Sequence, residues 1–209
     1  MPERVIEGPA CVAEGAAWLA ERDPAWARAL ELSGPWPDRL RPGGFPALVQ
    51  AIVSQQVSVA SAAAIGGRVE AAGLHDPDTV LAADDETLKA CGLSRPKQRY
   101  LRALAEAGID FDALSRAPRD EVIATLVAVK GIGVWTAEIY ALFALGRADV
   151  FPAGDLALQE SARLLFELPE RPTERALRDM AEDWSPWRGV AARGLWAYYA
   201  HEKSREGIR

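Results

Sequence analysis

The chain has 209 residues, of which 49% are hydrophobic and 26% are charged, and these proportions are typical of a soluble globular protein. Its net charge of −6 excludes nucleic-acid binding through overall positive charge alone. Every apolar run is interrupted by charged residues, and Met1–Pro9 has no apolar signal core. We therefore expect no membrane association and an intracellular, cytoplasmic location.

The sequence pattern is helical almost throughout, because Ala, Leu, Glu and Arg dominate and the alternation typical of strands is missing. Glycine and proline residues separate the helical segments. The expected helices cover residues 10–21, 24–33, 44–54, 58–72, 77–82, 85–91, 96–107, 119–129, 134–145, 156–167, 173–183 and 187–203. The pattern predicts an all-α fold.

Few side chains are available for metal or redox chemistry. The two cysteines, Cys11 and Cys91, are too few for an iron–sulfur cluster or a four-thiolate zinc site. The two histidines, His75 and His201, leave little for a metal site or a histidine-based triad. We therefore expect neither.

A group of basic residues lies near the middle of the chain, at Arg95, Lys97, Arg99 and Arg102. A local basic face can bind phosphates on an acidic protein, with an affinity that falls steeply with salt. A solvated helix face explains the same residues, and from charge alone we favour that interpretation.

The segment Gly131-Ile132-Gly133 predicts a tight turn between two helices, the first ending in apolar residues such as Leu126 and the second continuing through Ala137. Two glycines so spaced permit positive φ angles and the close approach of a phosphate to the helix N-terminus that follows. A turn without any ligand would also use these glycines. We favour phosphate binding, because the apolar spacing on both sides fits a helix–hairpin–helix element, which contacts DNA phosphates and not bases.

A carboxylate stands at the start of the next expected helix, at the end of Phe151-Pro152-Ala153-Gly154-Asp155. Aspartate is a common helix N-cap, and a cap is the simpler interpretation of Asp155. The two interpretations are compatible, since a capping carboxylate can also face the sugar–phosphate backbone of DNA held by the hairpin.

The hairpin, followed by Val150–Asp155, resembles the helix–hairpin–helix DNA glycosylase superfamily. Further matches at 51–58, 92–97 and 184–188 resemble its 3-methyladenine DNA glycosylase II branch, and the likeness covers residues 40–200. The resemblance implies a two-lobed helical core with an active-site cleft between the lobes. The expected lobes are residues 1–55 with 150–209, and residues 56–149 with the helix–hairpin–helix at 126–142.

By this resemblance, Asp155 takes the position of the family's catalytic carboxylate. Trp135 and Trp196 match aromatic positions near the base pocket, and Gln55 falls in the segment that enters the gap left by a flipped base. Gln56 stands where the family often has an apolar wedge, so the wedge residue stays open. The expected base-pocket residues are Trp135, Trp196, Tyr140, Trp187 and Gln55, and the expected DNA contacts are Lys130, Gly131, Ile132, Gly133, Val134, Thr136, Gln56, Ser94 and Lys97.

The chemistry expected of Asp155 is electrostatic, because positive charge develops on the sugar as the N-glycosidic bond breaks. Relatives that also cut the strand resemble this chain but carry a Schiff-base lysine where Trp135 stands. Lys130 lies on the other side of the turn and is better placed for phosphate. We therefore expect no lyase activity and no cofactor, although a monovalent cation at the hairpin carbonyls is compatible with the sequence.

The sequence thus predicts a monomeric, monofunctional glycosylase that removes alkylated bases, of the 3-methyladenine and 7-methylguanine type, from double-stranded DNA with a damaged base. Two alternatives stay open. One is a glycosylase for deaminated or oxidised bases, and the other is a non-catalytic DNA-binding module that uses the hairpin as a phosphate clamp.

Overall fold

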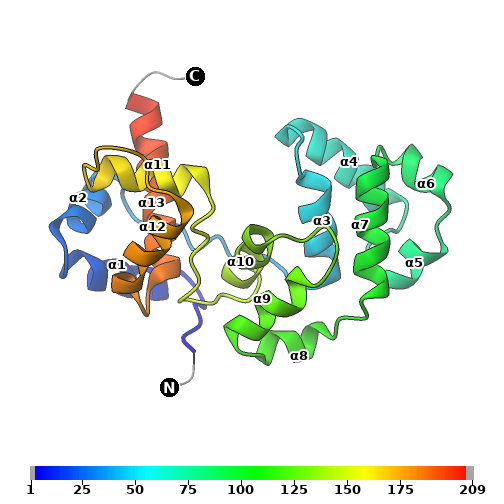
Figure 1. The fold of residues 1–209 in the computed structure, drawn as a ribbon, viewed down its shortest axis with the longest axis horizontal. Helices are drawn as coiled ribbons and strands as arrows, with labels where there is room; N and C mark the ends of the chain where they lie inside the picture. Colours follow the sequence, from blue (N-terminus) through cyan, green and yellow to red (C-terminus); the bar gives the residue numbers. More distant parts are fainter. Residues whose placement is uncertain (1–2, 206–209) are drawn as a thin grey trace. The chain divides into compact units, whose positions relative to one another are not determined.

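A computed structural model describes residues 3–205, and within this range the chain forms helices and no strand (Figure 1). The helices are α1 (Pro9–Ala20), α2 (Pro24–Ser33), α3 (Phe45–Ser54), α4 (Val59–Ala71), α5 (Pro77–Ala82), α6 (Asp85–Ala90), α7 (Arg95–Glu106), α8 (Phe111–Arg116), α9 (Arg119–Val127), α10 (Val134–Phe143), α11 (Leu156–Leu165), α12 (Glu174–Met180), the 3₁₀ helix η1 (Ala181–Trp184) and α13 (Arg188–Arg205). The predicted all-α fold is confirmed.

Contacts divide the chain into two compact units. The first combines Met1–Arg41 with Ala141–Arg209, and the second is Pro42–Tyr140. The boundaries therefore differ from the predicted ones, which fell after residues 55 and 149. Helix α3 belongs to the second unit because it packs against α4 and α7, and the second boundary falls inside α10.

Helix α13 is the centre of the first unit, where α1, α2, α11 and η1 pack against it (Figure 1). The core beside it is aromatic: the Trp26 ring meets Trp36, Phe166 and Trp184 edge-on, with centroids 5.1–5.9 Å apart. Gly194 of α13 permits this packing, because a Cβ atom there would lie 2.7 Å from the Trp36 ring. This core fixes α13, which carries Trp196, and α11, which begins directly after Asp155.

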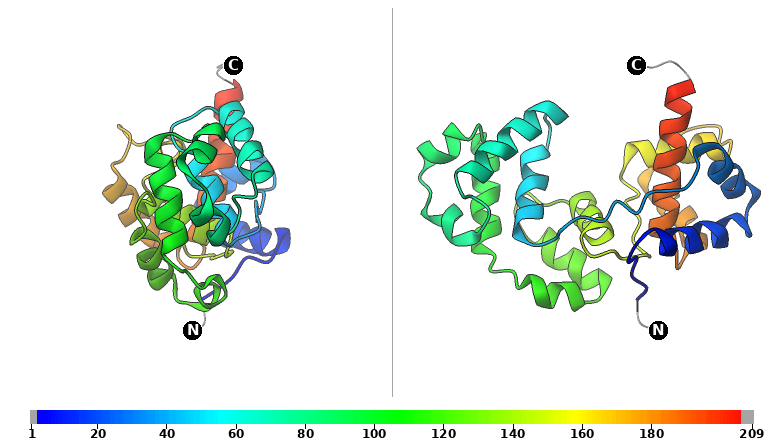
Figure 2. Two further views of the ribbon diagram at one scale, coloured as in Figure 1. Left: turned by 90° about the vertical axis from the view of Figure 1, so that its right-hand side faces the viewer. Right: turned by 180° about the vertical axis from the view of Figure 1, so that it is seen from behind.

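Helix α7 organises the second unit by packing against α3, α5 and α6, and Figure 2 shows α3 and α7 side by side from behind. The short helices here begin at aspartates that cap them, including Asp76, Asp84 and Asp110. Hydrogen bonds from Thr79 and Thr87 hold the pKa values of Asp76 and Asp84 below their ordinary range.

The sequence did not predict α8, which is only six residues long. Helices α5 and α6 are equally short and were predicted, so length alone does not explain the miss.

An ion pair connects the segment before Asp155 to the start of α13. Asp149 accepts hydrogen bonds from Arg188 Nε and Nη2, at 2.8 and 2.7 Å, and from Ser185 Oγ at 3.0 Å. Both charged side chains are largely buried, with 16% and 14% exposure. Burial raises the pKa of Asp149, but the bonds and charge of Arg188 outweigh it, so the pKa lies below its ordinary value of 3.8.

Replacing Asp149 with asparagine should lower the free energy of unfolding at pH 7 by about 3 kcal/mol, because Arg188 loses a buried partner. The stabilisation depends on the ionised carboxylate: it is complete above the unfolded pKa and is lost as pH falls through the lower folded pKa. The difference between wild type and Asp149→Asn in urea unfolding should therefore shrink as the pH falls through and below the ordinary carboxyl pKa. A difference independent of pH would contradict this assignment.

Candidate active site

The predicted hairpin is present, with α9 and α10 on either side of Gly131-Ile132-Gly133. Gly131 has φ +97°, and a Cβ atom there would lie 2.2 Å from the Tyr100 ring, so only glycine fits. Its carbonyl oxygen accepts a hydrogen bond of 2.9 Å from Gln55 Nε2. Ile132, one of the predicted DNA contacts, is buried inside the turn. The turn is therefore held by contacts to α7 and to the end of α3.

Gly133 differs from Gly131 in what surrounds it. Its φ is not positive, it is exposed, and a Cβ atom there would meet nothing within 4 Å. Nothing within the described chain therefore requires glycine at this position. Because Gly133 lies directly before α10, its missing side chain leaves the first amides of that helix accessible to an approaching group.

The exposed surface of the hairpin includes Lys130, Val134 and Trp135. The two apolar side chains are large and nearly half exposed, Val134 at 45% and Trp135 at 46%. Thr136, in contrast, is buried. A cation, the N-terminus of a helix and an exposed indole therefore lie within one short segment.

Asp155 is the N-cap of α11, as one sequence interpretation predicted. Its Oδ1 accepts hydrogen bonds from the amides of Ala157 and Leu158, at 2.9 and 3.1 Å. The indole Nε1 of Trp196, on α13, also lies 3.4 Å from Oδ1. Both side chains are only partly buried. The carboxylate is thus fixed in orientation and still reaches solvent.

The loop that carries Asp155 is held in place by packing and hydrogen bonds. Phe151 packs edge-on against Trp184, with ring centroids 5.3 Å apart. The buried Gln159 donates from Nε2 to the Ala153 carbonyl oxygen, at 2.9 Å. The Asp155 amide closes a turn onto the carbonyl of Pro152. These contacts fix the backbone from which the carboxylate projects.

The Trp196 ring rests against Phe143 at the end of α10, with centroids 5.6 Å apart and planes tilted by 33°. Both belong to the first unit, together with Asp155. Sequence reasoning missed Phe143, because an apolar residue on an apolar helix carries no signal that separates a site from a core.

Two predicted pocket aromatics have other roles. Trp187 is only 2% exposed, and Gly15 of α1 packs so closely on it that a Cβ atom would lie 2.7 Å from the ring. Tyr140 is 5% exposed, and its hydroxyl oxygen accepts the amide hydrogen of Gly44 at 2.9 Å. Burial raises the pKa of Tyr140. Both are core residues, and the prediction that they line the base pocket is corrected.

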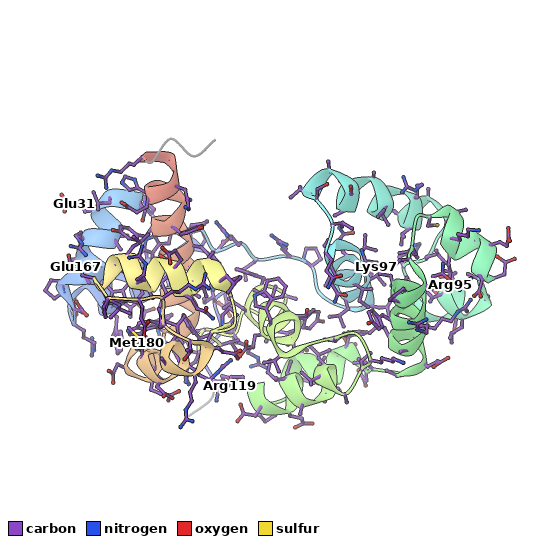
Figure 3. All side chains as sticks on the ribbon, turned by 45° about the horizontal axis from the view of Figure 1, so that its top comes forward. Glu31, Arg95, Lys97, Arg119, Glu167 and Met180 are labelled. Atoms are coloured by element: carbon purple, nitrogen blue, oxygen red, sulfur yellow. The ribbon has the colours of Figure 1, made fainter. Side chains whose placement is uncertain are left out.

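The prediction that Lys97 contacts DNA is also corrected. Its ammonium group donates to the Val53 carbonyl oxygen, at 2.7 Å, and the side chain is only 8% exposed. Figure 3 shows Lys97 between α7 and α3, whereas Arg95 projects away from α3. Burial lowers the pKa of Lys97. It holds the last turn of α3 in place and is not a surface contact for phosphate.

The remaining predicted residues are Gln55 and Gln56, in the loop after α3, and Ser94, at the start of α7. The side-chain amide of Gln55, a predicted base-pocket residue, donates to the Gly131 carbonyl of the hairpin. Gln56 is exposed and has φ +56°, in the left-handed region that few side chains adopt. Ser94, at the start of α7, is exposed as well. Gln56 and Ser94 thus stay available for DNA, and Gln55 becomes a brace.

Residues 49–186 match the model of a family described as HhH-GPD superfamily base excision DNA repair protein. The chain belongs to this superfamily. It is 33% identical over 190 residues to DNA-3-methyladenine glycosylase 1 of Schizosaccharomyces pombe, covering 85% of this chain and 83% of that relative. The crystal structure of a DNA-3-methyladenine glycosidase from Bacillus halodurans matches with a TM-score of 0.81 at 33% identity, covering 99% of this chain and 95% of that one.

A third match is the Schizosaccharomyces pombe 3-methyladenine DNA glycosylase Mag1 in complex with abasic DNA. Its TM-score is 0.76 at 32% identity, covering 88% of this chain and 95% of that one. These relatives confirm the resemblance drawn from the hairpin and the Asp155 segment, including the 3-methyladenine glycosylase branch. The family match includes both elements, whereas Trp196 lies beyond its end.

Two further findings concern the described residues of this HhH-GPD protein. Within 3–205, no three His, Cys, Asp or Glu side chains gather into a group that could hold a metal ion. No helix in the same range has the length and apolar character needed to cross a membrane.

Proposed function

We propose that this HhH-GPD protein is a DNA glycosylase that hydrolyses the N-glycosidic bond of alkylated bases in double-stranded DNA. The observation that carries the proposal is Asp155, a carboxylate fixed by two backbone amides beside the half-buried indole of Trp196. The names of its relatives support the alkylated-base substrate, since several are 3-methyladenine glycosylases.

The proposed reaction consumes one water and yields the free base and an abasic site. As the bond from the sugar to the base breaks, the electron pair leaves with the base and positive charge develops on the sugar. The Asp155 carboxylate stabilises that charge and orients or deprotonates the attacking water. An alkylated purine is already cationic, so it leaves without a strong general acid.

In this proposal the hairpin binds the DNA backbone. The backbone N–H groups at the start of α10, next to Gly133, donate hydrogen bonds to a phosphate, and Lys130 adds a positive charge. Held in this way, the duplex can yield its damaged nucleotide to the enzyme, as required of any enzyme that acts on a base buried in the stack.

Exposed aromatic faces select the base in this proposal. A cationic base gains about 1–2 kcal/mol over a tryptophan face compared with a neutral one. Of the aromatic residues predicted to line the base pocket, Trp196 beside Asp155 is partly exposed and Trp135 is 46% exposed, which supports this role.

Replacing Trp135 with alanine should therefore reduce the preference for cationic bases about tenfold, while affinity for abasic duplex changes less than threefold. The measurement is the ratio of release rates for 7-methylguanine and hypoxanthine, compared with binding to a duplex that contains an abasic analogue. Val134→Ala, which shortens the neighbouring exposed side chain, is the control. An unchanged ratio in Trp135→Ala would show that Trp135 has no role in base selection.

We further propose that the enzyme leaves the strand intact, because Trp135 stands where the strand-cutting relatives have lysine. It acts inside the cell as a monomer, and it needs no organic cofactor, since water and a carboxylate suffice for this hydrolysis. A monovalent cation at the hairpin stays a prediction. The Gly131 carbonyl, one candidate ligand, already accepts the Gln55 amide.

The test is a panel of duplexes that each contain one lesion: an alkylated purine, hypoxanthine, uracil or 8-oxoguanine. We expect the alkylated purine to be released fastest and strands to break only after alkali. Faster release of a deaminated or oxidised base would favour the second kind of glycosylase. Binding without release of any base would favour the non-catalytic module.

A further inference from the structure

Three arginines surround the aromatic pair beside Asp155, and all belong to the first unit. The Arg39 guanidinium lies 6.0 Å from the centre of the Trp196 ring. Those of Arg41 and Arg193 lie 5.8 and 4.9 Å from the centre of the Phe143 ring. Like charges gathered in this way repel one another, and the Asp38 carboxylate offsets part of that repulsion at Arg193.

Arg193 is the buried member of the group. Its guanidinium donates to three backbone carbonyls, of Asp38, Leu142 and Gly189, at 2.8–3.2 Å. Burial lowers its pKa to about 10, the charge of Asp38 opposes this shift, and the smaller effect of Arg39 adds to it. Arg193 is thus a structural cation that holds the segment leading to Arg39 against α13.

The segment that carries Arg39 and Arg41 is fixed at both ends. Arg193 holds the Asp38 carbonyl, and the Arg41 amide donates to the Phe143 carbonyl at 3.0 Å. Between them, Arg39 has φ +54°, a left-handed conformation that costs a non-glycine residue about 1 kcal/mol or more. Such strain persists only where the surrounding structure imposes it, and it is a reason to look for function.

Arg39 and Arg41 are exposed, and neither forms an ion pair with a carboxylate of residues 3–205. Other arginines of this unit do: Arg4 pairs with Glu14, and Arg188 pairs with Asp149 and Glu182. Placement over an aromatic ring leaves the edge N–H groups of a guanidinium directed outward, in the planar fork that suits a phosphate.

We propose that Arg39 and Arg41 form a binding site for phosphodiester groups of the DNA strand that carries the damaged base. The two side chains are held ready by their aromatic neighbours, so little side-chain freedom is lost on binding. Through Trp196, the site adjoins the carboxylate that acts on the sugar. This inference rests on the proposed function in that the bound phosphates are those of the repaired strand.

The test is the salt dependence of duplex binding by the whole protein. Each phosphate contact that is lost should reduce the slope of log affinity against log salt by about 1. We expect Arg39→Asn and Arg41→Gln each to weaken binding about tenfold at low salt, and the double variant about a hundredfold. This slope arises from the counterions that DNA releases when its phosphates are neutralised, so it reports contacts to the DNA backbone.

Arg22→Gln is the matched control, because Arg22 is also an exposed arginine of this unit stacked on a tryptophan, 3.6 Å from the centre of the Trp18 ring. It should leave the slope unchanged. Asparagine tolerates the left-handed conformation, so Arg39→Asn should keep or raise the melting temperature while affinity falls. A purely structural role for Arg39 would lower both.

A slope and an affinity within twofold of wild type in the double variant would overturn the proposal, as would equal weakening by Arg22→Gln. This result can be told apart from the test of the proposed function. If the Arg39 and Arg41 variants reduce the salt slope but the wild-type protein releases no base, the glycosylase function is refuted and the phosphate site stands. If the wild-type protein releases base and the variants leave the slope unaltered, the phosphate site is refuted and the glycosylase function stands.

Discussion

Replacing Asp155 with asparagine should lower the rate of base release at least about a hundredfold, while the fold and the affinity for duplex DNA stay close to wild type. Asparagine is as good an N-cap as aspartate, so α11 keeps its first turn. The change removes the negative charge that we propose to stabilise the sugar cation, and one such fixed group is worth about a hundredfold or more in turnover.

The chain provides a matched control for this variant. Asp23 caps α2 in the same unit, where its Oδ1 accepts the Ala25 amide at 2.8 Å. Asp23→Asn makes the same chemical change at another N-cap, and it should retain full activity. Single-turnover rates on methylated duplex, with melting temperatures for all three proteins, make the comparison. Turnover in Asp155→Asn within threefold of wild type would leave Asp155 with a capping role only.

Replacing Gly131 with alanine should destabilise the protein by about 3 kcal/mol and greatly weaken DNA binding. Alanine at φ +97° is strained, and its Cβ atom would overlap the Tyr100 ring, so the turn must move away from α7. Movement of the turn also breaks the hydrogen bond from Gln55 and displaces the amides at the start of α10.

Alanine variants of two other glycines separate the effects of backbone strain, of steric overlap and of lost phosphate binding. Gly108 has φ +57° and open space around it, so Gly108→Ala should cost only the backbone strain, about 1 kcal/mol, and leave DNA binding unaltered. Gly133→Ala should keep the melting temperature, since nothing in the protein lies near its Cβ, and should weaken binding if a phosphate approaches there. Urea unfolding and duplex titration of the three variants test this. Equal stability of Gly131→Ala and Gly108→Ala would contradict the steric account.

The features that were predictable from the sequence are those encoded locally. The all-α fold follows from helical composition, the turn from Gly131 and Gly133, and the cap at Asp155 from the residue type before a helix. Each of these signals lies within a few residues along the chain, where backbone geometry is decided.

The roles that sequence reasoning assigned incorrectly depend on which side of a helix faces a neighbour. Trp187 and Trp196 are both tryptophans near the C-terminus, but Trp187 packs on Gly15 while Trp196 reaches Asp155. Lys97 belongs to a basic run, yet its ammonium group is buried and donates to the Val53 carbonyl in the last turn of α3. Tertiary packing decides these contacts, and a single sequence contains no record of it.

The unit boundaries were misplaced for a related reason. The loop after α3, at Gln55 and Gln56, looks like a natural junction because it contains no helical pattern. Helix α3 nevertheless packs with α4 and α7, and the chain changes unit earlier, after Arg41. The backbone there is held by Arg193, a residue far away in sequence.

The most direct test of the central claim is chromatography of the free bases that wild-type protein releases from methylated duplex DNA, with strand breaks scored before and after alkali. The proposed function predicts free 3-methyladenine or 7-methylguanine in the soluble fraction and breaks that appear only after alkali. An absence of free base, in a protein that binds the same duplex, would contradict it and leave a helix–hairpin–helix protein that binds DNA without acting on it.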